Sequence, residues 1–118
     1  MRSQVFSLTV LDRPIRAELT FLDEGVHVLL TGGCLSHIGS VTVAEAGGTE
    51  QTIDLPGHRE AEVSRLWAAS LAARLRCRVA VTCGIHYDGL TRQQLKIVLE
   101  GLDALLRQVE AALPPEVL

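Results

Sequence analysis

The stretch TGGCLSHIGS, residues 31–40, interrupts two apolar, β-rich runs with paired glycines and a histidine that no packing argument requires. Glycine and histidine recur together in two further stretches, LPGHRE at residues 55–60 and GIHYDG at residues 84–89. Each stretch falls at the end of an expected strand or at the start of an expected helix, where binding residues are commonly placed. The sequence therefore predicts one shared pocket built from three segments.

Upstream of this stretch, residues 4–11, 14–22 and 26–30 have the pattern of three strands. The second run alternates between apolar and polar residues, which predicts one buried face and one exposed face. Its apolar members are Ile15, Ala17, Leu19 and Phe21. The break at residues 12–13 and a second break before the third run favour hairpin turns, so an antiparallel meander is expected.

Downstream, residues 38–45 are expected to form a fourth strand and residues 50–53 a short fifth strand at an edge. The composition then changes, because residues 56–75 are rich in Ala, Leu, Arg and Glu and repeat apolar residues at helical spacing. Asp54 is a suitable cap for this helix. The apolar run CRVAVTC, residues 77–83, is typical of a central strand covered on both faces.

The last element is a helix that begins at a capping box, in which Thr91 and Gln94 satisfy exposed backbone groups. Leucine and valine then recur at helical spacing up to Val109, and a Pro-Pro pair follows. The resulting order, ββββ(β)αβα, predicts an α+β fold: a mostly antiparallel sheet of five to six strands with two helices. A length of 118 residues is that of one domain, residues 1–118.

Composition argues against several classes of protein. The net charge is −3 and the eleven Lys and Arg are scattered, so nucleic acid is not an expected partner. No apolar run approaches the roughly 20 residues of a membrane span, and the N-terminal segment lacks the pattern of a secretory signal, so a cytoplasmic protein is expected. Cys34, Cys77 and Cys83 are an odd number without a CxxC pair, and we expect them to be small buried residues.

The paired glycines, Gly32 and Gly33, admit two interpretations. Without side chains they would let a flat or phosphorylated ligand approach the backbone amides directly. Alternatively, they permit a wide turn or bulge between two strands. A Walker loop is excluded because no Lys-Ser or Lys-Thr follows and because a strand, not a helix, comes next.

His37, His58 and His86 carry the candidate chemistry. His58 and Arg59 lie in the expected first helical turn, which could bind a phosphate, although Glu60 and Glu62 could satisfy the helix dipole instead. His86 follows the expected central strand and is a candidate ligand-binding residue or a turn residue bonded to backbone. His27 alternates away from the buried face and is expected to be a partly exposed strand residue.

Two catalytic alternatives remain open at this point. His37, His58 and His86 are the right ligand type for a catalytic zinc, but their spacing gives no support for a shared site. A Cys–His nucleophile could use Cys34 or Cys83, but nothing in the sequence marks either thiol as activated.

Taken together, the ordered motifs GG…SHIG, LPGH.E and GIH.D resemble the LpdD-like proteins, small accessory proteins of UbiD-type decarboxylases. The resemblance runs from about residue 26 to residue 99. It implies that the chain binds reduced prenylated FMN, made by a UbiX-type prenyltransferase, and helps to deliver it to the decarboxylase without catalysis of its own. It also implies a homodimer whose fold is similar to that of proteasome assembly chaperones.

On this resemblance we expect Arg59 and the start of the first helix to hold the flavin phosphate, and the histidines to donate hydrogen bonds to the isoalloxazine. A metal-dependent hydrolase or lyase using the three histidines, and an assembly chaperone without a small-molecule ligand, are the alternative functions. The expected cofactor-binding residues are Gly32, Gly33, Ser36, His37, Ile38, Gly39, His58, Arg59, His86 and Asp88.

Overall fold

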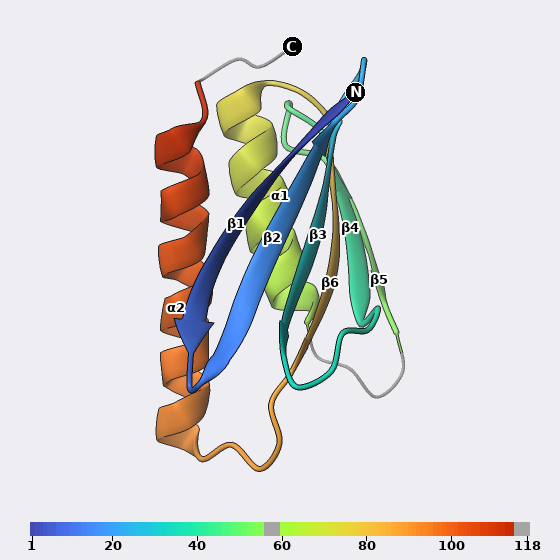
Figure 1. The fold of residues 1–118 in the computed structure, drawn as a ribbon. Helices are drawn as coiled ribbons and strands as arrows, with labels where there is room; N and C mark the ends of the chain where they lie inside the picture. Colours follow the sequence, from blue (N-terminus) through green and yellow to red (C-terminus); the bar gives the residue numbers. More distant parts are fainter. Residues whose placement is uncertain (56–59, 115–118) are drawn as a thin grey trace.

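The computed structural model describes residues 1–55 and 60–114, and in it a six-stranded sheet carries two helices on one face (Figure 1). The order of elements is βββββαβα, which confirms the α+β class expected from the sequence. The elements are β1 (Arg2–Val10), β2 (Arg13–Phe21), β3 (Val26–Gly33), β4 (Ser40–Ala44), β5 (Glu50–Asp54), α1 (Ala61–Leu75), β6 (Val79–His86) and α2 (Arg92–Ala112).

The strands lie in the order β1-β2-β3-β6-β4-β5. Only β3 and β6 are parallel, so the sheet is mostly antiparallel and β6 is central, as expected. Because β6 is inserted between β3 and β4, the connection from β3 to β4 must cross the end of β6. That connection is residues 34–39, within the stretch TGGCLSHIGS at residues 31–40.

The hairpin between β1 and β2 shows how local conformation sets the register. Val10 pairs with Arg13, and the two residues between them, Leu11 and Asp12, have φ of 51° and 64°. Positive φ at both central positions is the turn whose twist matches a two-residue hairpin. The turn therefore lies at residues 11–12, one residue earlier than the sequence indicated.

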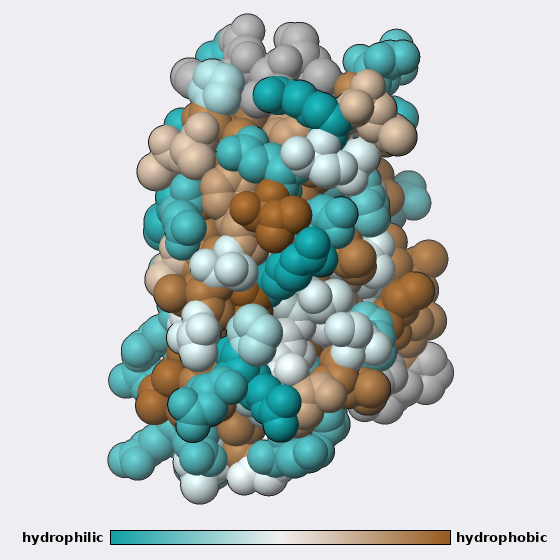
Figure 2. All heavy atoms as spheres, viewed as in Figure 1, coloured by the Kyte–Doolittle hydropathy of each residue, from teal (hydrophilic) through white to brown (hydrophobic). Residues whose placement is uncertain are grey.

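The two faces of the sheet differ in cover. The alternating apolar residues of β2 face the helices and are buried, as predicted. The opposite face has no covering element within the described residues, and Figure 2 shows it as polar groups with apolar side chains near the β4–β5 edge. The expectation that β6 is covered on both faces is therefore wrong: Ala80 and Thr82 are half-buried on the open side. His27, also on that side, is partly exposed as predicted and bonds Thr82 at 3.2 Å.

Helix α1 begins later than expected. It starts at Ala61, and Asp54 is the last residue of β5, so the predicted Asp54 cap is wrong. The expected first turn at residues 56–59 lies outside the described residues. The buried face of α1 includes Trp67 and Leu71, both fully buried against the sheet.

Helix α2 begins at the predicted capping box. The Gln94 amide N–H donates to Thr91 Oγ1 at 3.1 Å, and the Thr91 N–H donates to Gln94 Oε1 at 3.0 Å. Both helices start at the end of the sheet where β3 and β6 finish, the lower end in Figure 1. Residues 34–39, the end of β6 and Glu60 are brought together there. None of the described helices is long and apolar enough to span a bilayer.

Candidate functional site

Residues 34–39 cross the end of β6 in close contact with it. The Cys34 N–H donates to the carbonyl of His86 at 2.8 Å, and the Gly39 N–H donates to the carbonyl of Cys83 at 2.9 Å, so the loop is fixed to β6 at both ends. A β-carbon on Gly84 would collide with the carbonyl of His37. The loop can lie this close only because residue 84 has no side chain.

Three further motif glycines have similar packing reasons. A β-carbon on Gly33, whose φ is 81°, would collide with the carbonyl of His86, and one on Gly39 would collide with the Glu60 carboxylate. Gly32 is buried, and its β-carbon would lie 2.5 Å from Ile15 Cγ2. Close backbone approach therefore accounts for the glycines without a ligand, and the ligand contacts expected of Gly32, Gly33 and Gly39 stay predictions.

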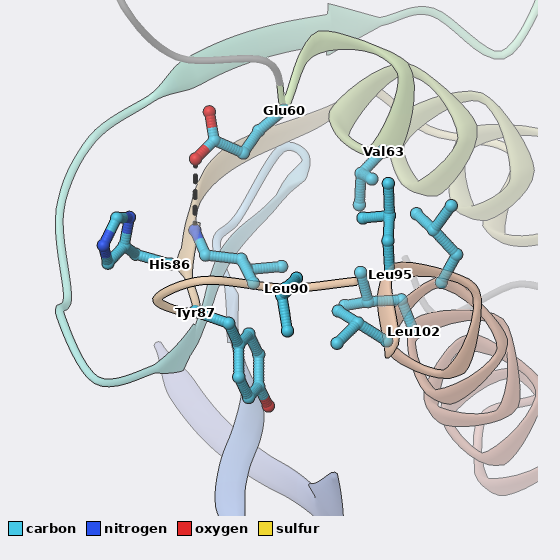
Figure 3. A pocket seen from close by; sticks show the side chains of 10 residues that line it. Glu60, Val63, His86, Tyr87, Leu90, Leu95 and Leu102 are labelled. Carbon is cyan, nitrogen blue, oxygen red and sulfur yellow. Dashed lines mark hydrogen bonds between the residues drawn. The ribbon is translucent and has the colours of Figure 1, made fainter. Parts of the chain in front are cut away.

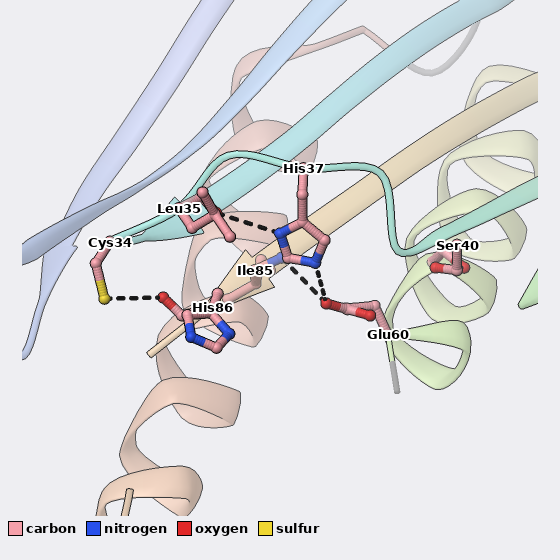
Figure 4. A network of polar contacts seen from close by, with 8 residues as sticks. Cys34, Leu35, His37, Ser40, Glu60, Ile85 and His86 are labelled. Atoms are coloured by element: carbon pink, nitrogen blue, oxygen red, sulfur yellow. Dashed lines mark hydrogen bonds and ion pairs between the residues drawn. The ribbon is translucent and has the colours of Figure 1, made fainter. Parts of the chain in front are cut away.

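The loop carries His37 onto Glu60, the residue before α1 (Figure 4). His37 Nε2 lies 2.9 Å from Glu60 Oε1, and His37 Nδ1 lies 3.2 Å from the carbonyl of Leu35. The carbonyl can only accept, so Nδ1 must carry a proton. Nε2 then forms the hydrogen bond with Glu60 Oε1, so both ring nitrogens of His37 have partners within the protein.

Glu60 also accepts a backbone hydrogen bond from the end of β6, where β4 no longer pairs with it. The Cys83 carbonyl is bonded from the β4 side, and groups two residues apart on a strand point the same way, so the Ile85 N–H also points to that side. The chain has left the sheet there, and Glu60 Oε1 accepts from Ile85 N–H at 3.4 Å. The second carboxylate oxygen, Oε2, is buried and has no hydrogen-bond partner among the described residues.

A second polar cluster lies at the exposed end of β6. His86 Nε2 is 2.8 Å from Asp88 Oδ1, and the Cys34 thiol lies 3.4 Å from the His86 carbonyl and 3.7 Å from Asp88 Oδ2. The hydrogen bond and charge of His86, with a smaller contribution from Cys34, lower the pKa of Asp88. The rings of His37 and His86 are edge to face with centroids 6.3 Å apart, so the two clusters adjoin.

A cavity of about 290 Å³ opens beside these clusters, between the end of β6, the start of α1 and the first turns of α2 (Figure 3). Glu60 and His86 border it at one side, and apolar side chains form the other wall. Volumes near 300 Å³, mostly apolar walls and a few polar groups are typical of small-molecule sites. The lining residues are Glu60, Val63, Ile85, His86, Tyr87, Leu90, Leu95, Val98, Leu99 and Leu102.

The structure brings only some of the expected binding residues together. His37, His86 and Asp88 meet at this site, whereas Ser36 and Ile38 are exposed on the loop and line neither of the two cavities near it. His58 and Arg59 lie outside the described residues, so the structure does not test them. Within residues 1–55 and 60–114, no group of three His, Cys, Asp or Glu is placed to hold a metal ion.

The cysteines differ from one another. Cys34 is exposed, so the expectation that all three are buried is wrong for it, and Cys77 is only partly buried. Cys83 is fully buried, and burial, followed by the charge of Glu60, raises its pKa to about 12. A thiol that stays protonated at neutral pH is a poor nucleophile, which argues against Cys83 in that role.

Sequence reasoning missed two parts of the site. The sequence places Glu60 in the LPGH.E motif and in the first helical turn but does not predict its contacts, and its side chain joins the loop, β6 and α1. The apolar wall was also missed, because helical periodicity assigns Leu95 and Leu99 to a core face, and both are 48% exposed. The signal for Glu60 was its place in LPGHRE, directly before a helix that packs on the central strand.

The fold is that of a known class of chaperone. A chain from the crystal structure of a chaperone complex for yeast 20S proteasome assembly superimposes with a TM-score of 0.56 at 15% identity, covering 94% of this chain and 98% of that chain. The likeness is one of fold. The sequence goes further: residues 10–114 match the family described as the prenylated flavin chaperone LpdD-like domain, and the chain belongs to that family. The protein LpdD of Lactiplantibacillus plantarum is 27% identical over an alignment of 100 positions that covers 80% of this chain and 74% of that protein.

Proposed function

We propose that this protein binds reduced prenylated FMN and helps to deliver it to a UbiD-type decarboxylase, without catalysing a reaction itself. Membership of the LpdD-like family supports a chaperone role connected with this flavin. The observation that carries the proposal is the cavity at the ends of β3 and β6, where His37, Glu60 and His86 adjoin an apolar wall. A flavin extended by a prenyl group presents the same combination of polar edge and hydrocarbon.

The polar side of the cavity supplies hydrogen-bonding groups for an isoalloxazine ring. His86 is bonded to Asp88 through Nε2, and its Nδ1 has no partner among the described residues. The side chain is 46% exposed, so a ligand can reach this nitrogen. Beside it, the Glu60 carboxyl group also lines the cavity. We propose that Arg59 and the start of α1 bind the flavin phosphate, because an arginine and the exposed N–H groups of a helix start both favour an anion.

A carrier has to hold its cofactor and release it unchanged. The arrangement around Cys83 supports this role, because a buried thiol with a pKa near 12 does not add to a bound flavin. The His37–Glu60 pair is engaged with the loop and with β6, so its contacts hold the site in shape. The Cys83 thiol is therefore shielded from a ligand, and the His37 and Glu60 side chains are used in hydrogen bonds within the protein.

We further propose that the protein is a cytoplasmic homodimer that receives its flavin from a UbiX-type prenyltransferase. The open face of the sheet supports a dimer, because Val5 is 48% exposed and Ile53 is 63% exposed on it. Apolar side chains on an uncovered face favour contact with a second protein surface. Light scattering of the wild type and of Ile53→Lys tests this: a dimer weakened by the substitution is expected, and a monomeric wild type would contradict it.

The delivery step is tested by transfer. The protein is loaded anaerobically with reduced prenylated FMN, freed of excess ligand, mixed with an apo UbiD-type decarboxylase and separated by size exclusion. We expect the flavin to move to the decarboxylase with an unchanged mass, and decarboxylase activity to appear. A flavin that comes back chemically altered would contradict the non-catalytic role, and a decarboxylase that acquires flavin no faster than from free solution would contradict delivery.

A further inference from the structure

The candidate site continues into a groove between the two helices. A second cavity, of about 410 Å³, lies between α1 and α2 and shares Val63, Leu95, Leu99 and Leu102 with the first cavity. Figure 3 shows Val63, Leu95 and Leu102 facing one another on the side away from His86. The remaining residues that line the groove are Glu62, Leu66, Trp67 and Asp103.

The groove leaves large apolar side chains exposed to solvent. Leu66 is 51% exposed, and Leu95 and Leu99 are each 48% exposed, so three leucines from two helices surround one hollow. Leaving leucine in water forgoes roughly 25 cal/mol for each Å² that could be buried, so a cluster of this kind favours an occupant. Trp67 lines the groove while fully buried, and its Nε1–H has no acceptor among the described residues.

Charge decides which part of a ligand can enter. Glu60, Glu62 and Asp103 border the two cavities, and no Lys or Arg among residues 1–55 and 60–114 lines either of them. These carboxylates would repel a phosphate placed inside either cavity. An uncharged hydrocarbon would contact the leucines, Val63 and Trp67 without such repulsion. The groove is therefore suited to the neutral end of an amphipathic ligand, with the phosphate left outside.

We propose that the groove between α1 and α2 seats the prenyl-derived hydrocarbon of the flavin and gives the protein its preference for prenylated over unmodified FMN. This inference rests on the proposed function and names the part of that site which recognises the prenyl group. The isoalloxazine then lies toward His86 and Glu60. Leu95 and Leu99 are the residues whose side chains decide the preference.

The test uses bulky substitutions that fill the groove from exposed positions. In Leu95→Trp and Leu99→Trp the new side chain occupies the hollow, and because the native side chains are half exposed the fold can accommodate the change. Ile97→Trp is the matched control: it lies on the same helix, is 45% exposed and lines neither cavity. Each full-length variant is titrated anaerobically with reduced prenylated FMN and with reduced FMN, and circular dichroism confirms that it is folded.

We expect Leu95→Trp and Leu99→Trp to weaken binding of prenylated FMN by about tenfold or more, since burying a few methylene groups contributes that much affinity. Binding of unmodified FMN should change little, and Ile97→Trp should behave as the wild type. Prenylated FMN bound equally well by all folded variants would overturn the groove assignment and leave the proposed function intact. A wild type that binds neither flavin would overturn the proposed function and this assignment with it.

Discussion

His37 Nε2 and Glu60 Oε1 lie 2.9 Å apart and join the loop over β6 to the residue that precedes α1. The two side chains are 13% and 10% exposed, so the contact is largely shielded from water. Glu60 also accepts the Ile85 N–H, and His37 also bonds the Leu35 carbonyl. One hydrogen-bonded pair thus connects three segments that are distant in sequence, and its Glu60 member lines the cavity.

This pair predicts a coupled loss of stability. Replacing either partner leaves a buried polar group unsatisfied, so His37→Ala and Glu60→Ala should each cost about 1–3 kcal/mol in free energy of unfolding. The double variant should cost clearly less than the sum, because both changes remove the same interaction. Urea unfolding of the four proteins measures the coupling. Strictly additive effects would mean that the two side chains do not interact in solution.

The close contact between Gly84 and the loop predicts a large effect from a single methyl group. In Gly84→Ala the new β-carbon meets the His37 carbonyl, so the loop or β6 must shift, and a loss of about 1–3 kcal/mol is expected. Gly47→Ala is the control, because a β-carbon at that position has no atom within 4 Å. Thermal unfolding followed by circular dichroism compares the two. Equal melting temperatures would show that the loop does not lie against residue 84.

The three thiols should react in a fixed order. Cys34 is exposed, burial raises the pKa of Cys77, and burial raises the pKa of Cys83 to about 12. Iodoacetamide at pH 8 should therefore modify Cys34 first and Cys77 more slowly, and it should reach Cys83 only after unfolding. Peptide mass spectrometry over time gives the order. Early alkylation of Cys83 in the folded protein would contradict its burial at the centre of the sheet.

The contact between His86 and Asp88 predicts a pH effect whose sign is fixed. Because the pKa of Asp88 is lower in the folded protein, mainly through the hydrogen bond and charge of His86, the stabilisation is present above the unfolded-state pKa. It is lost as the pH falls through the folded-state value. NMR titration should find the pKa of Asp88 below its usual value in the wild type and near that value in His86→Ala. His27→Ala, a histidine on the open sheet face, should leave it unchanged.

Sequence patterns predicted the class of fold because each rests on a local physical rule. Alternation along β2, the capping box at Thr91 and the apolar run of β6 all correspond to observed elements. The errors arose where tertiary contacts decide. Leu11 adopts a left-handed conformation that its side chain does not favour, which moved the hairpin turn by one residue. β6 is covered on one face because both helices pack on the same face of the sheet. The sequence of a strand does not show on which face other elements pack.

The candidate site was predicted in outline only. Residues 34–39, the end of β6 and Glu60 do meet at one end of the sheet, and His37 lies against His86. The glycines themselves could not be interpreted from the sequence, since close approach of backbone and direct ligand contact require the same absent side chain. The exposure of the groove leucines could not be recognised either. Helical periodicity shows which residues share a face but not whether a neighbouring helix covers them.

The most direct test of the central claim is an anaerobic calorimetric titration of the full-length protein with reduced prenylated FMN. We expect saturable binding by the wild type that weakens by about tenfold or more in His86→Ala, which removes a polar group that lines the cavity, and in His37→Ala, which removes the hydrogen-bond partner of Glu60. His27→Ala, which alters a histidine away from the cavity, should bind as the wild type does. Absence of binding to the wild type, or equal binding by all four proteins, would contradict a flavin site at the ends of β3 and β6.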